Sequence, residues 1–326
     1  MRQLLTLVCL ILFLPLIFNA AAQSASDSVP EFSSEEVANL KRSFAKLVAG
    51  NTVFTSRDAV STGRLNFDDG GEIDVLNLPF SHSFYKNVDG SLFQLRGAIG
   101  NLKGRNSIKE LWEESLKAGG NAATNRPDFL RDEATSLSIG ALYGFSPIQN
   151  LSIQMAFDTV WTHLRRMFDF NNTISKEIGA KYDRDLFNNS TEALSYSPSL
   201  ALEYKVNFDG FIVRPAVRYA HFWTESLWSK SAFGDFNANY GVLQPELNVD
   251  IPLVVAETEV TLRPHVKATT LYGDARTAVD DETFIDYGLG FAKRFSSLDD
   301  GELFLGFSIL KGNSFDGGRL DFNVTW

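Results

Sequence analysis

The chain has 326 residues and a formal net charge of −10, from 30 basic and 40 acidic residues. An acidic chain without a basic stripe is a poor partner for nucleic acid, so we exclude nucleic-acid binding. The single cysteine, Cys9, lies in the first segment. A mature chain without that segment therefore has no disulfide, thiol nucleophile or cysteine metal site. The 27 phenylalanines are a heavy aromatic load that the elements below must explain.

Residues 1–22 have the pattern of a secretory signal peptide. Arg2 precedes the apolar run LLTLVCLILFLPLIF, and Ala20 and Ala22 form a small-residue cleavage site before Gln23. The run is short for a membrane anchor, which needs about 20 apolar residues. Removing residues 1–22 takes away Arg2 and no acidic residue, so the net charge of −10 becomes −11. No later apolar run reaches the length of a membrane-spanning helix.

The next segment, residues 23–51, contains the one stretch with clear helical periodicity. Ser33 and Glu36 are spaced as a capping box, apolar residues follow at helical spacing, and Gly50 suits a helix C-terminus. We therefore predict an amphipathic helix over residues 33–49. It could be a plug inside a lumen, a periplasmic helix packed below a barrel, or a docked linker, and the sequence leaves all three open.

Period-two alternation dominates residues 52–326, which we expect to form a second domain. In residues 151–158, for example, Leu151, Ile153 and Phe157 alternate with Gln154 and Asp158. Such alternation predicts strands with one apolar and one polar face. The expected strands are 58–68, 72–85, 91–103, 134–145, 151–164, 197–206, 211–223, 241–253, 258–272, 283–294, 302–311 and 319–326.

The connections between these strands indicate how they are arranged. Short turns alternate with long polar loops at 104–133, 165–196, 224–240, 273–282 and 312–318. This pattern is typical of outer-membrane barrels, which have short periplasmic turns and long outer loops. We therefore predict an all-β fold: a transmembrane antiparallel up-and-down β-barrel of about 12 strands with a short N-terminal helix. A large secreted β-sandwich is the alternative, in which the apolar faces would meet each other.

Two features complicate regular strands. The apolar residues of EIDVLNLPFSHSFY change face near Leu76, which predicts a bulge there. Proline removes a ladder hydrogen bond and prefers edges or bulges, yet a closed barrel has no edge. We expect two prolines at strand ends and bulges at three others: Pro198 and Pro252 at ends, and Pro215, Pro245 and Pro264 in bulges.

The polar faces of the strands should line the lumen. Their charged members mix both signs, so we expect a network of paired charges that narrows the pore. The predicted lumen-facing residues are Glu203, Lys205, Arg214, Arg218, Glu246, Asp250, Arg263 and Lys267.

The C-terminal residues RLDFNVTW resemble the assembly signal of outer-membrane barrels, because apolar residues alternate with polar ones up to a terminal aromatic residue. The resemblance assigns that signal to Leu320, Phe322, Val324 and Trp326. The stretch DYGLGF before a last hairpin is similar to the end of autotransporter β-domains, which have twelve strands and a helix before the first. Only residues 23–32 separate the cleavage site from the predicted helix. The chain therefore resembles a solitary autotransporter-type barrel without a passenger.

This resemblance implies a bacterial outer-membrane location among outer-membrane lipids and lipopolysaccharide. It also implies assembly by the barrel-assembly machinery with periplasmic chaperones. We expect a porin-like monomer that is a narrow or plugged pore or a structural membrane protein. We expect no cofactor, no metal site and no catalytic residues.

A surface enzyme of the lipase, deacylase or protease type is the alternative function, with histidine as the expected base. His82 lies in SHSF, without the His-x-Ser-Asn-Gly pattern of the outer-membrane phospholipase and toward the expected periplasmic end. His163 and His221 should face outward near the outer rim, and His265 should face the lumen between two basic residues. Acidic loop residues at 183–185 and 280–281 could bridge lipopolysaccharide through divalent cations. Since no histidine clearly joins a serine or carboxylate at the outer rim, the non-enzymatic barrel is favoured.

Overall fold

A computed structural model describes residues 48–51, 53, 60–68, 71–86, 91–108, 127–171, 176, 188–229, 236–255, 257–277, 281–295 and 301–325. The chain divides into two compact units, Met1–Ser33 and Ser34–Trp326, and every described residue belongs to the second. The predicted signal peptide, residues 33–47 of the predicted helix and Trp326 lie outside the described residues.

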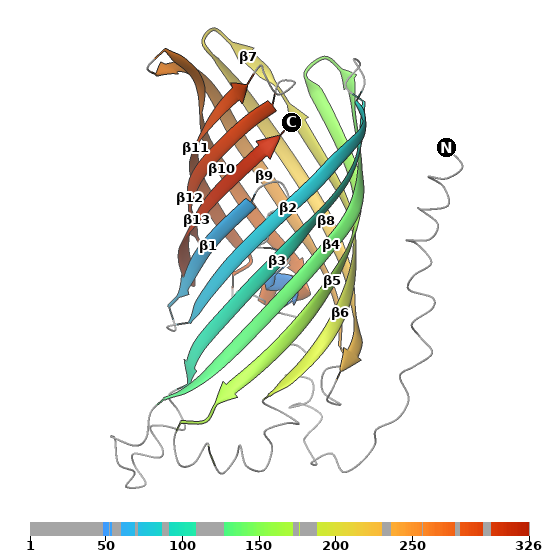
Figure 1. The fold of residues 1–326 in the computed structure, drawn as a ribbon, viewed down its shortest axis with the longest axis vertical. Helices are drawn as coiled ribbons and strands as arrows, with labels where there is room; N and C mark the ends of the chain where they lie inside the picture. Colours follow the sequence, from blue (N-terminus) through green and yellow to red (C-terminus); the bar gives the residue numbers. More distant parts are fainter. Residues whose placement is uncertain are drawn as a thin grey trace, which may run out of the picture. The chain divides into compact units, whose positions relative to one another are not determined.

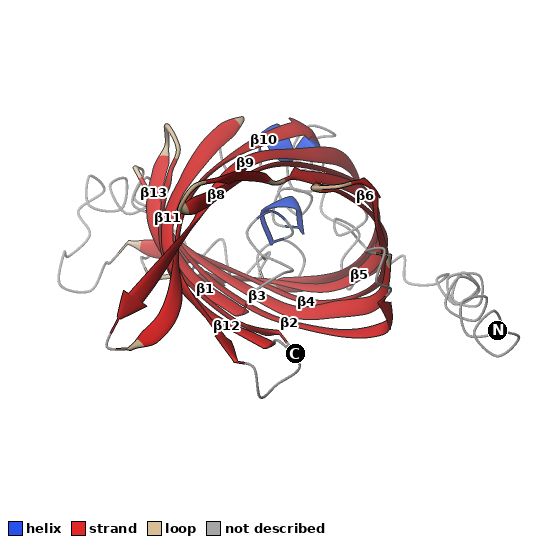
Figure 2. Cartoon of the chain, turned by 90° about the horizontal axis from the view of Figure 1, so that it is seen from above, coloured by secondary structure: helices blue, strands red, loops and turns tan. Residues whose placement is uncertain are grey.

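The described strands form one antiparallel sheet that closes on itself (Figures 1 and 2). Their bounds are β1 (Val60–Phe67), β2 (Glu72–Lys86), β3 (Leu92–Ile108), β4 (Asp128–Ile148), β5 (Leu151–Asp169), β6 (Asn189–Tyr204), β7 (Val206–Phe208), β8 (Phe211–Ser229), β9 (Asn237–Val255), β10 (Thr258–Gly273), β11 (Thr283–Phe295), β12 (Gly301–Lys311) and β13 (Phe315–Thr325). A short 3-10 helix, η2 (Asp274–Thr277), follows β10.

Closure depends on two pairings, β1 with β13 and β6 with β8. The short β7 continues β6 beyond Lys205, because Glu203 pairs with Ala216 and Val206 with Val213 in a single register along β8. The barrel therefore has 12 strands, which confirms the predicted fold class. Among the described residues, no helix has the length and apolar composition that crossing a membrane requires.

Side chains alternate between the two faces of this sheet as the sequence predicted. On β4, the outward Leu137, Ile139 and Tyr143 are 39%, 48% and 44% exposed, whereas the inward Ser136 and Ser138 are buried. Outward apolar side chains of this kind surround the barrel, as contact with lipid requires.

The strands reach further toward the long loops than the sequence indicated. β3 ends at Ile108 and β4 begins at Asp128, so the expected loop 104–133 is shorter at both ends. The outward residues there include Lys103 and Arg131, which interrupt the apolar alternation while backbone pairing continues. A transmembrane strand needs about 9–11 residues, so β4, with 21 residues, is longer than a bilayer crossing would require.

The bulge expected near Leu76 is absent, and that prediction is wrong. β2 pairs in one register with β1 and β3 through this point, and its irregularity lies between Ser83 and Tyr85. The apolar residues change face because the barrel interior is itself apolar at this level. Val75 is buried inside, whereas Leu76 is 42% exposed on the outer face.

The bulges expected at three prolines are also wrong. Pro215 pairs with Leu247 and Pro245 with Val217 in a continuous β8–β9 register, and Pro264 pairs with Leu289 in the β10–β11 register. Each of these prolines instead lacks a pairing partner on its second neighbouring strand. β10 pairs with β9 at Leu262 and again at His265, and the ladder skips the two described residues between them, Arg263 and Pro264.

The two prolines that we expected at strand ends differ in their positions. Pro198 lies within β6 opposite Phe157 and not at a strand end. Pro252 lies three residues before the end of β9 and pairs with Thr261. At Pro198, Pro215, Pro245 and Pro264 the closed barrel thus accommodates proline by omitting two residue pairs on one side of the strand, without shifting the register at these points.

Candidate functional site

A helical segment at residues 48–51 lies inside the barrel (Figure 2). Val48, Ala49 and Asn51 have no exposed surface. Val48 and Ala49 belong to a cluster of buried apolar residues that we call the apolar ring. The ring residues come from the strand ends nearest the long loops and include Leu65, Val75, Leu102, Leu164, Phe222, Tyr240, Leu271, Phe284, Leu310 and Phe315.

Aromatic contacts stabilise the apolar ring. The rings of Phe222 and Tyr240 stack with centroids 4.9 Å apart. Phe315 packs against both Phe67 and Phe284, with aromatic ring centroids 5.5 Å apart in each pair. Burying one Val-sized side chain stabilises a fold by about 1.5–3 kcal/mol, so hydrophobic packing holds the segment in place. The interior of a water-filled barrel would instead be polar at this height of the wall.

A polar cavity of about 210 Å³ lies in the lumen next to this segment. Val53, two residues beyond the described helical segment, lines it together with side chains from the barrel wall. Its charged lining residues are Arg96, Glu203, Arg218, Glu246, Lys267 and Arg319. The lumen therefore has an apolar part around residues 48–51 and a polar part beside it.

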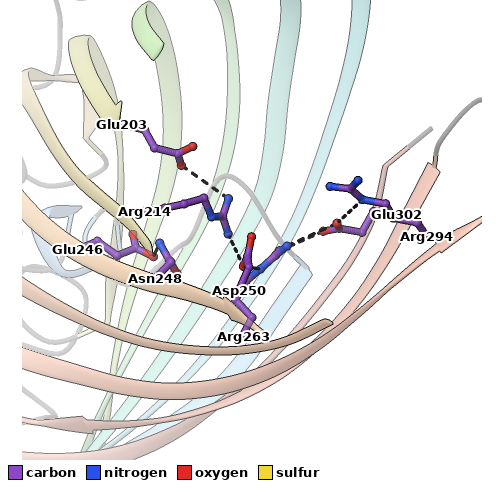
Figure 3. A network of polar contacts seen from close by, with 8 residues as sticks. All are labelled: Glu203, Arg214, Glu246, Asn248, Asp250, Arg263, Arg294 and Glu302. Carbon is purple, nitrogen blue, oxygen red and sulfur yellow. Dashed lines mark hydrogen bonds and ion pairs between the residues drawn. The ribbon is translucent and has the colours of Figure 1, made fainter. Parts of the chain in front are cut away.

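Six charged residues form a belt along the inner wall toward the short turns (Figure 3). In order, the belt is Glu203, Arg214, Asp250, Arg263, Glu302 and Arg294.

Positive and negative charges alternate along the belt, which passes through β6, β8, β9, β10 and β12 and then returns to β11. Arg214 Nη2 and Arg263 Nε donate to Asp250 Oδ1 at 3.1 and 2.7 Å. Arg263 Nη1 also donates to Glu302 Oε1 at 3.0 Å. Weaker contacts of 3.8 Å join Glu203 to Arg214 and Arg294 to Glu302. Each carboxylate thus offsets a neighbouring guanidinium, which matters most for the largely buried Arg214, Asp250 and Arg263. Arg294, at the end of the belt, is 81% exposed.

A second charged group surrounds Asp286 on β11, whose side chain is fully buried. Arg319 Nη2 lies 2.9 Å from its carboxylate, and Lys267 Nζ and His265 Nε2 lie at 3.6 Å. Arg319 also donates to Asp321 at 3.0 Å. These contacts connect β10, β11 and β13 across the inner wall.

Two bidentate pairs complete the charged interior. Arg96 donates to both carboxylate oxygens of Asp158, at 3.0 and 2.8 Å, and both side chains are buried. Arg166 donates to both oxygens of Asp132, at 2.7 and 2.8 Å. Such fork geometry gives strong and oriented pairs. These pairs narrow the lumen and fix the side chains that line it.

The structure places the eight residues that the sequence assigned to the lumen in three settings. Arg214, Asp250 and Arg263 lie in the belt. Glu203, Arg218, Glu246 and Lys267 line the cavity, and Glu203 also joins the belt. Lys205 is exposed between β6 and β7, and its backbone N–H donates to Asn150 O at 2.8 Å.

Sequence reasoning missed several members of these groups. The missed residues all stand at positions of their strands whose side chains point inward. They are Arg96, Asp286, Glu302, Arg319 and Asp321. The alternation of inward and outward side chains along each strand could have identified them. In the C-terminal strand, Leu320, Phe322 and Val324 are 53%, 44% and 36% exposed on the outer face.

The four histidines lie in separate surroundings. His265 contacts Asp286 in the lumen wall. On the outer face, His163 Nδ1 is 3.7 Å from Glu192, and His221 Nδ1 is 3.2 Å from the Tyr219 hydroxyl. The ring of His82 packs edge-on against Phe84 at 4.8 Å. In the part of the chain that the structure describes, no group of three His, Cys, Asp or Glu residues could hold a metal ion.

A protein-family model, the solitary outer membrane autotransporter beta-barrel domain, matches residues 45–324. The chain belongs to this family. The match begins next to the lumenal segment and ends in β13, so this solitary autotransporter-type barrel includes residues 48–51 as part of the family domain.

Solved structures show the same fold. The β-domain of the Bordetella autotransporter Brka is 8% identical with a TM-score of 0.51, and the match covers 82% of this chain and 99% of that one. The transport unit of the autotransporter AIDA-I from Escherichia coli is 10% identical with a TM-score of 0.56, covering 88% and 99%. No curated protein matches the sequence.

The predicted family and fold are therefore confirmed, and the protein is a bacterial outer-membrane barrel of the translocator type. The family is one of translocator barrels and not of known enzymes.

Proposed function

We propose that this solitary autotransporter-type barrel is a plugged pore, closed in its resting state by its own N-terminal segment. The observation that carries the proposal is the complete burial of Val48, Ala49 and Asn51 inside the barrel, with the first two packed in the apolar ring. Water and ions cross an apolar constriction poorly, because they would lose hydrogen bonds there.

Three features support a narrow pathway beyond the plug. Barrels of about eight strands are filled by side chains and those of about sixteen enclose a channel, so 12 strands leave an intermediate lumen. A helix about 10–12 Å across can occupy much of that space. The belt and the Arg96–Asp158 pair then reduce the remaining opening while leaving a polar cavity.

The experiment is conductance in planar bilayers. The intact mature protein should conduct poorly, and deletion of residues 23–50 should raise conductance because it removes Val48 and Ala49 from the apolar ring. Deletion of residues 23–44 is the matched control, since it shortens the chain yet keeps residues 48–51. That control should remain as closed as the intact protein.

Heat-modifiable migration must show that each variant is a folded barrel. Unchanged conductance in the folded 23–50 deletion would contradict the plug and would leave a structural or loop-mediated role.

We further propose how the barrel reaches its membrane. Residues 1–22 are removed during export, and β13 with Trp326 is recognised by the barrel-assembly machinery after passage with periplasmic chaperones. In the membrane the protein acts as a monomer among lipids and lipopolysaccharide. No catalytic role is proposed, because His163, His221 and His82 contact Glu192, Tyr219 and Phe84 without a serine nucleophile among their described contacts.

A further inference from the structure

Small side chains on three neighbouring strands make room for the lumenal cavity of about 210 Å³. Long side chains reach the same cavity from β3, β10 and β13. At about 30 Å³ of liquid volume for each water, the space equals about seven waters. Pockets for drug-sized ligands occupy about 300–1,000 Å³, so a ligand of this cavity must be smaller. The small lining residues on β5, β6 and β8 are Ser152, Ala156, Ser199, Ala201, Ala216 and Ala220.

Most of the cations that line the cavity are offset by carboxylates in the barrel wall. Arg96 donates to both carboxylate oxygens of the buried Asp158. Lys267 Nζ lies 3.6 Å from the fully buried carboxylate of Asp286, and Arg319 contacts that carboxylate at 2.9 Å and a second one at 3.0 Å. These three cations therefore add little net charge to the cavity. The carboxylates that offset them are Asp158, Asp286 and Asp321.

The other charged lining residues also balance one another. Arg218 and Glu246 have opposite signs, and Glu203 contacts Arg214 of the belt at 3.8 Å. An ion of either sign would lose hydration on entering the cavity without meeting a net opposite charge that compensates for the loss. The lining therefore favours a solute without net charge.

Neutral hydrogen-bonding groups complete the lining. Gln154, on the inner face of β5, is exposed to the lumen, and its side chain makes no hydrogen bond to another described residue. The amide nitrogen of Gln244 donates to Thr269 Oγ1 at 3.3 Å, and its carbonyl oxygen is a further acceptor. Ser152 and Ser199 add hydroxyl groups, each of which can donate and accept. The cavity thus offers donors and acceptors together.

We propose that the cavity binds one small, uncharged, polyhydroxylated solute of the size of a single sugar ring. Each hydroxyl of such a solute donates and accepts, as the amides and hydroxyls of the lining require. Its carbon skeleton would contact Phe222 and Val242, which belong to the apolar ring and also line the cavity. The cavity exists with residues 48–51 in place, so binding does not require the plug to open. The proposal and the plug can therefore fail separately.

The test is saturation-transfer difference NMR on the purified mature barrel, in a detergent without a sugar headgroup. The probes are D-glucose, D-galactose and D-mannose, of which at least one should bind at millimolar concentration. Two analogues examine what the site recognises: D-glucuronate adds a charge to the sugar ring, and cyclohexanol has a six-membered ring with a single hydroxyl. Both should bind at least about tenfold more weakly than the best sugar, because buried polar groups of the site would be left unpaired or a charge would be desolvated.

Three variants locate the site. Gln154→Leu removes an amide from the cavity and should weaken binding of the best sugar about tenfold. The matched control, Gln94→Leu, removes an inward, half-buried amide on β3 that is not among the described lining residues, and should leave the affinity unchanged. Ala201→Leu fills part of the cavity and should abolish binding. Heat-modifiable migration shows that each variant is folded.

Absence of binding by all three sugars would overturn the proposal. Equal affinity for cyclohexanol would show a space that accepts any ring, and equal affinity for D-glucuronate would show that charge balance does not select the ligand. Either result would contradict the assignment. Equal affinities of the Gln154→Leu and Gln94→Leu variants, or full binding by a folded Ala201→Leu barrel, would place the sugar outside the cavity and would also refute it.

Discussion

At the residue scale, two adjacent side chains on β9 test which side chains of the barrel wall face lipid and which face the lumen. Leu247 is 47% exposed on the outer face, whereas Glu246 lines the cavity and accepts a hydrogen bond of 2.9 Å from Asn248. Arginine at a lipid-facing site near the bilayer centre costs about 2–4 kcal/mol. We expect Leu247→Arg to lower the free energy of unfolding by that amount and Glu246→Arg to lower it much less. Urea unfolding midpoints measure both, and equal midpoints would contradict the facing.

A pair of glycines on β4 gives a second test at this scale. A Cβ at Gly140 would lie 2.2 Å from Asp158 Oδ1 and 2.5 Å from the Phe157 carbonyl oxygen, whereas at Gly144 the nearest atom is 3.6 Å away. Gly140→Ala should therefore displace Asp158 from Arg96 and cost about 1–3 kcal/mol. Gly144→Ala should change stability by less than about 0.5 kcal/mol. Thermal unfolding of the two variants compares them, and equal stability would argue against the close contact at Gly140.

At the element scale, the burial of the helical segment predicts chemical protection. A mature chain without Cys9 has no other thiol, so Ala49→Cys and Val254→Cys each introduce a single reporter. Ala49 has no exposed surface, whereas Val254, near the short-turn end of β9, is 74% exposed. A water-soluble maleimide should modify Ala49→Cys at least about tenfold more slowly, because reaction requires local opening. Similar rates in the folded barrels, with similar rates after unfolding, would place the segment outside the lumen.

At the scale of the whole molecule, closure depends on the last strand. β13 pairs with all eight residues of β1, from Val60 opposite Phe322 to Phe67 opposite Phe315, and also with β12. Without it, two strand edges would expose unpaired backbone groups to lipid, at several kcal/mol for each group. Deletion of residues 315–326 should therefore abolish the barrel in cells.

Trp326→Ser separates the proposed assembly signal from this pairing, since it leaves β13 itself intact. We expect less protease-resistant, heat-modifiable barrel in the outer membrane, although the purified variant should still fold in detergent. Normal amounts in cells would show that the terminal aromatic residue is dispensable.

The sequence by itself determined the fold class, the number of strands and the outward apolar face. These follow from a local rule, because successive side chains on a strand point to opposite faces whatever the rest of the chain does. Residues such as Leu247 and Leu137 therefore carried their orientation in the alternation alone.

Only the tertiary structure decided what the inward face meets. The alternation alone made Ile73 and Val75 look like an irregularity of the strand. In the structure Val75 belongs to the same buried cluster as Val48 and Ala49, and Ile73 packs against that cluster. The pairing partners of Asp286 and Arg96 were equally hidden, because they depend on which strands lie side by side and in what register. The prolines likewise needed no bulge once neighbouring rungs held the register. Local alternation fixes which way a side chain points, whereas closure of the barrel fixes what it touches.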